Sequence, residues 1–181
     1  MRNLMNPAAA LATILSPVPR AQAQAPALAA EDYTFDKQQI GDWSVYGYRD
    51  KCWMLQPVAT KETTVSFSFS KANRSLHIGA EDRGWTEFSD MKRYQVEVEL
   101  GKVSRTMVGF GLRDEALGPL MVVFMSDSDG GDFFAMLRRA NRLKLSLEGN
   151  VMIDLPMKGH GPAVDYFEKC AQALRTGPFN N

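Results

Sequence analysis

Alternation of apolar and polar residues dominates the chain from residue 42 onward. In the clearest case, apolar residues and serines alternate from Val65 to Ser70. A period of two places successive side chains on opposite faces, so it predicts strands with one buried face and one hydrated face. A continuous apolar run at 120–125 predicts a strand covered on both faces. The strand segments predicted in this way are 43–48, 52–55, 65–69, 76–78, 94–100, 103–112, 120–125, 143–147 and 151–155.

Short polar connections join several of these segments. Residues 49–51, 101–102 and 148–150 each separate two neighbouring segments, and the last two connections contain Gly, which tolerates the positive φ of a tight turn. These connections predict three hairpins. The predicted fold is therefore mainly β, an antiparallel sandwich or barrel of about eight strands.

Two segments near the C-terminus have helical spacing instead. Apolar residues recur three and four positions apart at 133–140 and again at 163–174. Pro162 stands at the start of the second segment, where its missing N–H is not needed. We expect two short helices, and the apolar stripe of the second includes Cys170, which should face the sheet.

The first residues differ from the rest of the chain. A short basic start at Arg2 precedes a modest apolar stretch at 7–18 and a small-x-small pattern at 21–25, which is typical of a secretory signal. The alternative, a buried helix, is disfavoured by three prolines in this stretch. The predicted organisation is a signal peptide at 1–23, a flexible leader at 24–35, one β-rich domain at 36–176 and a tail at 177–181. The expected location is the periplasm or the exterior.

Charge and hydropathy exclude two classes of partner. Lys and Arg number 21, as do Asp and Glu, so there is no overall basic field for nucleic acid. Lys51, Lys61, Lys71 and Arg74 are spread along the chain and do not form the sequence cluster of a polyanion site. No apolar run reaches the roughly 20 residues that a membrane-spanning helix needs. We therefore expect no nucleic acid partner and no membrane span.

The two cysteines of the chain, Cys52 and Cys170, should form a disulfide if the protein is exported. The alternative is a catalytic thiol with His77 or His160 as its base. Neither cysteine has the flanking residues of a known thiol enzyme.

An acidic stretch at 126–132 is a weak candidate for a calcium site through Asp127, Asp129 and Asp132. The EF-hand spacing is broken there, because Gly131 stands where a third ligand belongs. Capping of the following helix is the preferred interpretation. We expect no metal and no cofactor.

Three functional hypotheses remain open. In a small periplasmic hydrolase, acids and histidines would converge only in the fold, because no Gly-x-Ser-x-Gly elbow is present; we expect His77 and His160 to be solvated surface residues. A barrel binding an apolar ligand would have a cavity lined by Phe67, Phe110 and Phe124. The leading hypothesis is a non-enzymatic binding domain whose partner is an unknown envelope or extracellular protein.

Aromatic residues suggest where such a domain would bind. Tyr46 and Tyr48 lie on the strand face opposite Trp43, so they should be partly exposed if Trp43 is in the core. With Trp53 and Trp85 they form a possible binding surface. The alternative is that these rings pack under loops or against the helices.

Several short motifs carry a family resemblance. They are Ile40–Val45 with a Cys soon after it, Leu143–Lys158, Gly159–Val164 and Phe167–Cys170. In these the chain resembles small exported alphaproteobacterial proteins of the invasion-associated locus B family. The resemblance implies a periplasmic or secreted β-rich domain with no established enzymatic activity, cofactor or catalytic residue, and a role at the host interface for some members. Members often have further cysteines, whereas this chain has two.

Overall fold

A computed structural model describes residues 33–58, 62–86, 88–114, 118–125 and 130–176. The predicted signal peptide, the predicted tail and all of the predicted leader before residue 33 lie outside the described residues. The described part of the chain consists of strands, two helices and the connections between them.

Ten strands form one antiparallel sheet in the order β1-β2-β3-β4-β5-β8-β7-β6-β9-β10, which does not close on itself. The predicted mainly β, antiparallel fold is confirmed, but a single open sheet of ten strands replaces the expected sandwich or barrel of about eight. The strands are β1 (Tyr33–Ile40), β2 (Trp43–Tyr48), β3 (Lys51–Val58), β4 (Thr63–Ser70), β5 (Ser75–Asp82), β6 (Arg93–Leu100), β7 (Val103–Asp114), β8 (Gly118–Met125), β9 (Arg142–Leu147) and β10 (Asn150–Pro156).

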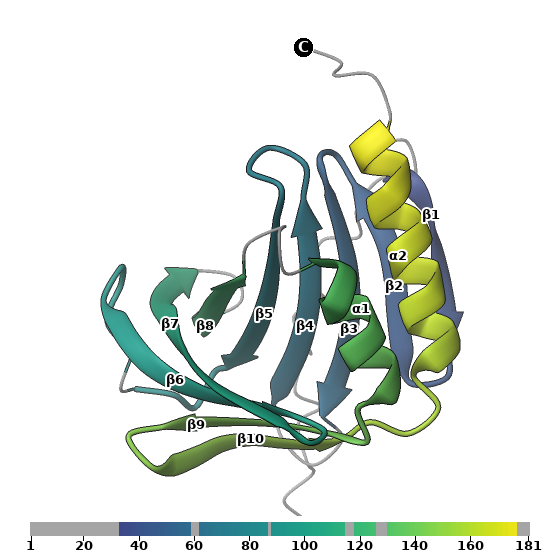
Figure 1. Ribbon diagram of the computed structural model, residues 1–181. Coiled ribbons are helices and arrows are strands. Elements are labelled where there is room, and N and C mark those ends of the chain that lie inside the picture. Colours follow the sequence, from purple (N-terminus) through teal and green to yellow (C-terminus); the bar gives the residue numbers. More distant parts are fainter. Residues whose placement is uncertain (1–32, 59–61, 87, 115–117, 126–129, 177–181) are drawn as a thin grey trace, which may run out of the picture.

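The three predicted hairpins are present as β2–β3, β6–β7 and β9–β10. Two pairings join strands that are distant in sequence, because β5 pairs with β8 and β6 pairs with β9. The second half of the sheet bends away from the first, so that β6, β9 and β10 run across the direction of β2–β4 (Figure 1).

The edge strand β1 is a correction to the sequence prediction, which placed 33–35 in a flexible leader. Its pairing with β2 extends from Tyr33–Tyr48 to Ile40–Trp43 with two register shifts. Residues 36–39 are all polar and exposed, so the strand is without a regular apolar alternation that would have revealed it.

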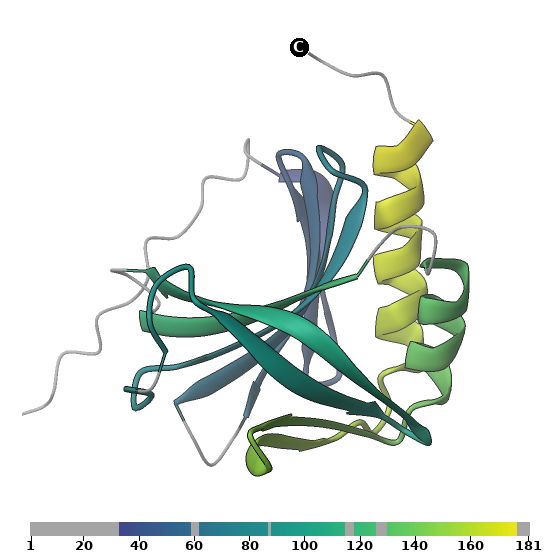
Figure 2. The ribbon, with the colours of Figure 1, turned by 60° about the vertical axis from the view of Figure 1, so that its left-hand side comes forward.

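The two predicted helices are present, α1 at Gly130–Arg139 and α2 at Gly161–Thr176. They lie side by side on one face of the sheet, where α2 contacts β1, β2, β3 and α1 (Figures 1 and 2). We call this the inner face. Its core contains a run of neighbouring aromatic rings whose centres are 5.5–6.1 Å apart. In order of contact they are Trp43, Phe67, Phe133, Phe134 and Phe167.

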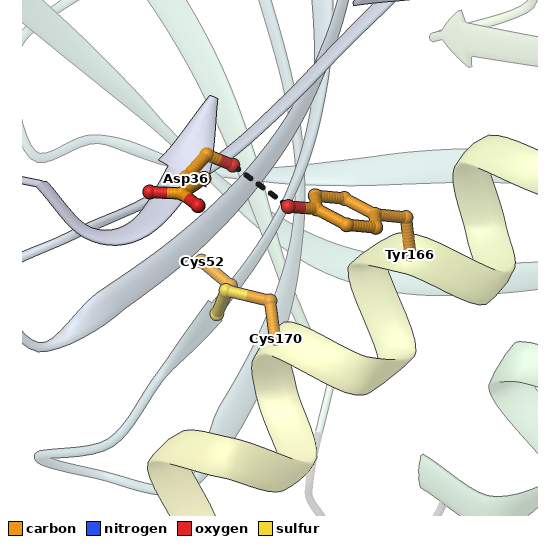
Figure 3. The surroundings of a disulfide bond; sticks show 4 residues. All are labelled: Asp36, Cys52, Tyr166 and Cys170. Atoms are coloured by element: carbon orange, nitrogen blue, oxygen red, sulfur yellow. Dashed lines mark hydrogen bonds between the residues drawn. A yellow bond between two sulfur atoms is a disulfide. The ribbon is translucent and has the colours of Figure 1, made fainter. Parts of the chain in front are cut away.

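The predicted disulfide is present between Cys52 on β3 and Cys170 on α2, with the two Cα atoms 6.0 Å apart (Figure 3). Both cysteines are completely buried. One turn earlier on the helix, the hydroxyl of Tyr166 donates a hydrogen bond of 3.1 Å to the Asp36 carbonyl of β1. The last helix is thus attached covalently to the third strand and by a hydrogen bond to the first.

Candidate functional site

The outer face of β2 and β3, opposite the helices, has a group of aromatic side chains. Tyr46 is paired across the strands with Trp53, and Tyr48 is paired with Lys51, so all four side chains are on one face. Trp43 is almost completely buried on the other face, and the three rings are half-buried. The sheet therefore gathers three of the four aromatic residues proposed from the sequence.

Each of the three rings has a cation over it. The distances from cation to ring centre are 5.9 Å for Lys37 and Tyr46, 5.0 Å for Arg49 and Tyr48, and 5.8 Å for Lys51 and Trp53. Such contacts contribute about 0.5–1 kcal/mol at exposed sites and hold the cation over the ring. We call these six residues the aromatic–cation surface. Only the contact between Lys37 on β1 and Tyr46 on β2 depends on strand pairing. Arg49 directly follows Tyr48, and Lys51 and Trp53 are two residues apart on one face of β3, so these two contacts are local in the sequence.

Trp85 is not part of this surface. It follows the end of β5 at Asp82, whose carbonyl accepts a hydrogen bond from the Trp85 N–H. Its ring packs edge-on against the buried Phe88 at 5.1 Å. Trp85 is half-buried there and packs against the core, as the alternative interpretation of the aromatic residues expected.

The cations that are spread along the sequence gather at one end of the sheet. Lys51 is paired with Ser70, the residue before Lys71, and the Lys71 N–H donates a hydrogen bond of 2.8 Å to the Asp50 carbonyl. The turn Arg49–Asp50 therefore lies beside the turn 71–74, which ends in Arg74. The expectation that these cations are scattered is wrong for Lys51, Lys71 and Arg74, because the pairing of β3 with β4 brings their two turns together. Lys61 lies outside the described residues.

His77 is buried, contrary to the expectation of a solvated residue. Its Nδ1 is 3.2 Å from the Ser68 hydroxyl on β4, and its Nε2 is 2.7 Å from the Ser75 hydroxyl. Ser68 and Ser70 are also buried, although they occupy the predicted hydrated face, because small side chains on a central strand lie between larger neighbours such as Trp53. Burial, with a smaller contribution from the Lys51 cation, lowers the pKa of His77 to about 4.

The proton positions in this cluster follow from its contacts. The Ser75 hydroxyl donates its one proton to the Asn73 side-chain oxygen at 2.5 Å. His77 Nε2 must then be the donor to Ser75, and Nδ1 the acceptor from Ser68. In a catalytic triad the nitrogen opposite the serine donates to a carboxylate, whereas here it donates to a second serine. These hydrogen bonds link His77 on β5 to β4 through Ser68 and, through Ser75, to Asn73 in the turn between the two strands.

His160 is also buried, where the sequence predicted a solvated turn residue. Its Nε2 is 2.6 Å from the Leu137 carbonyl in the last turn of α1. Its own carbonyl accepts a hydrogen bond from Val164 in the first turn of α2. His160 thus joins the end of one helix to the beginning of the next.

The calcium candidates lie wholly or partly outside the described residues. Asp127 and Asp129 lie outside the described part, and Asp132 belongs to the first turn of α1 with its side chain also outside it. Elsewhere in the described ranges, no three His, Cys, Asp or Glu side chains gather as metal ligands.

Phe67 and Phe110, two of the three residues proposed to line an apolar cavity, lie on opposite faces of the sheet. Phe67 is completely buried on the inner face. Gly109 shares the inner face with Phe67, because the strand pairings Gly109–Val123, Val123–Ile78 and Ile78–Phe67 connect the two positions. The next residue, Phe110, is therefore on the outer face, where the Arg93 guanidinium lies over its ring. The Phe124 side chain lies outside the described residues. An apolar depression between α1 and β6–β7 holds only about 20 Å³, the space of about one water molecule.

The structure defines a class of fold: one bent antiparallel sheet with two helices on its inner face, joined to it by a disulfide. The crystal structure of invasion associated protein B from Bartonella henselae is similar, with a TM-score of 0.52 and 13% sequence identity over 75% of this chain and 98% of that one. The expected resemblance is confirmed as a likeness of fold. No protein-family model matches the chain, and no curated protein matches it in sequence.

Neither the disulfide nor the helices conflict with the expected location. A disulfide between buried cysteines fits an extracytoplasmic protein. Among the described residues, no helix has the length and apolar composition needed to cross a bilayer.

Proposed function

We propose that this protein is a non-enzymatic periplasmic or secreted binding domain whose aromatic–cation surface contacts a protein of the envelope or the exterior. The observation that carries the proposal is the arrangement of three half-buried rings on the face opposite the helices, each with a cation over it. Tyr, Trp and Arg are the residues most enriched at the energetic centres of protein interfaces. The rings have polar edges and few rotatable bonds, so fixing them on binding costs little entropy.

The remaining chemistry of the described residues favours binding over catalysis. His77 and His160 both have hydrogen-bond partners that join structural elements. The disulfide fixes the inner face, which leaves the outer face of β2–β3 as a rigid platform. The similar Bartonella protein is described as invasion associated, which is consistent with a contact role for this fold.

Site-specific photo-crosslinking in intact cells tests this proposal. A photoreactive amino acid at position 53 should give an adduct with another protein, identified by mass spectrometry. The matched control is the same amino acid at position 158, an exposed lysine between β10 and α2. No adduct from position 53, or the same adduct with equal yield from both positions, would contradict the proposal.

A further inference from the structure

Two basic turns, Arg49–Asp50 and 71–74, extend the aromatic–cation surface to the end of the sheet. Both loops project at the same end, next to the last turn of α2 (Figures 1 and 2). The residues 49–51 and 71–74 contain four cations and one carboxylate, a local charge of four minus one, or plus three. The whole chain has 21 basic and 21 acidic residues, so this charge is a local concentration.

Three of these cations are not neutralised within the described part of the protein. Four ion pairs between described residues are made by Arg138, Arg142 and Lys144, which lie on α1 and β9. Arg49, Lys51 and Arg74 are exposed and form no ion pair with a described carboxylate. The field of Lys51 on β3 reaches β5, two strands away, where it helps to lower the pKa of His77.

Three features select the kind of anion that fits. The faces of Tyr46, Tyr48 and Trp53 have cations over them, so nucleic acid bases cannot stack there as they do on free aromatic platforms. The large apolar side chains most exposed in the described part lie on β7, on β10 and before β6, so no apolar anchor for a lipid bilayer accompanies the charge. Arginine binds carboxylates through two parallel hydrogen bonds.

We propose that the two basic turns bind an acidic, Asp- or Glu-rich segment of the partner protein. This inference rests on the proposed function and adds to it the chemistry of the partner. Carboxylates of the segment would pair with Arg49, Lys51 and Arg74. Two of these cations are held in place by aromatic rings, Arg49 by Tyr48 and Lys51 by Trp53.

The backbone of the two turns allows a test that separates charge from stability. Arg49 and Arg74 have φ values of 53° and 50°, in the left-handed region that favours Gly and Asn. Met91 and Glu148 have the same conformation elsewhere, so this geometry alone does not mark a site. Replacing both arginines by Gly removes two charges and relieves the backbone, so the melting temperature should stay the same or rise.

The experiment measures binding of a fluorescein-labelled oligoglutamate peptide to the full chain by fluorescence anisotropy. Wild type should bind, and binding should weaken with added salt as expected for charge pairing. The Arg49→Gly/Arg74→Gly variant should bind about tenfold or more weakly. The control Lys102→Gln/Lys158→Gln loses the same charge from the β6–β7 turn and the β10–α2 connection, and it should bind as wild type does.

Three results of the binding experiment would overturn the inference. They are an equal loss in the control variant, no loss in the arginine variant, and binding of heparin or anionic lipid vesicles but not of the peptide. If the Gly variant is destabilised, Arg49→Asn/Arg74→Asn provides the same charge change with a residue that tolerates positive φ. An adduct from position 53 that is unchanged by the arginine substitutions would refute the acidic segment and leave the proposed function intact.

Discussion

The bond between Cys52 and Cys170 offers the most direct test of how this fold is stabilised. Reducing it in the wild-type protein breaks the bond and adds one hydrogen to each sulfur, but both sulfur atoms stay in the core. Replacing both cysteines by Ala breaks the same bond and also removes two sulfur atoms from completely buried positions. Comparing the two perturbations separates the covalent contribution from the packing contribution.

The expected magnitude depends on the separation of the two cysteines. They are 118 residues apart, and closing a loop of that length removes unfolded-state freedom equivalent to about 5 kcal/mol at 25 °C. Measured values are more often about 2–4 kcal/mol. For a domain of this size such a loss lowers the melting temperature by about 5–15 °C. The Ala variant should lose somewhat more, because each missing sulfur leaves a small cavity.

Differential scanning calorimetry of the oxidised, reduced and Ala forms measures these differences. The helix α2 should remain folded in all three at room temperature, because Phe167 is completely buried and Tyr166 still bonds to β1. A reduced form that melts within about 2 °C of the oxidised form would refute the reasoning. Two reactive thiols in the unfolded, unreduced protein would show that the bond does not form.

Two further predictions concern single side chains. The pKa of His77 is about 4 in the folded protein and 6.5 in the unfolded chain, so the unfolded state takes up the proton first and stability should fall as the pH drops from about 6.5 to 4. After allowance for solvent screening we expect about 1–2 kcal/mol, measured by urea unfolding; a His77→Gln variant with the same slope as wild type would contradict this origin. Phe67→Ala should cost about 3–5 kcal/mol, because the ring is completely buried between Trp43 and Phe133. Phe110→Ala, on the outer face, should cost about 1 kcal/mol, and equal losses would contradict the assignment of the two faces.

Local patterns in the sequence predict the elements well where one face of a strand is apolar. The hairpins at 43–55, 94–112 and 143–155 follow from alternation and turn residues, and α2 follows from its apolar stripe. The strand β1 could not be found in this way, since it lies at the edge of the sheet and buries little. Pairings between distant strands, such as β5 with β8, leave no mark on local periodicity.

The candidate site was predictable only in part, because part of it depends on strand pairings that local periodicity does not show. The alternation in β2 correctly separates Tyr46 and Tyr48 from Trp43. Register decides the rest, because it sets Lys51 beside Ser70 and so brings Lys71 near Asp50. It also places His77 between two serines. His77 is buried there, although the polar residues of its strand face predicted that it would be exposed.

The position of the disulfide also sets the order in which the protein can mature. Synthesis begins at the N-terminus, so Cys52 emerges 118 residues before the thiol with which it must combine. During that interval the inner faces of β2 and β3 have no helix over them, and the Cys52 thiolate can attack a foreign disulfide, which forms a mixed disulfide and releases the other sulfur as a thiol. The native disulfide can therefore form only after the final helix has been made. A mixed disulfide formed earlier at Cys52 is the misfolded product that a disulfide isomerase would have to reverse.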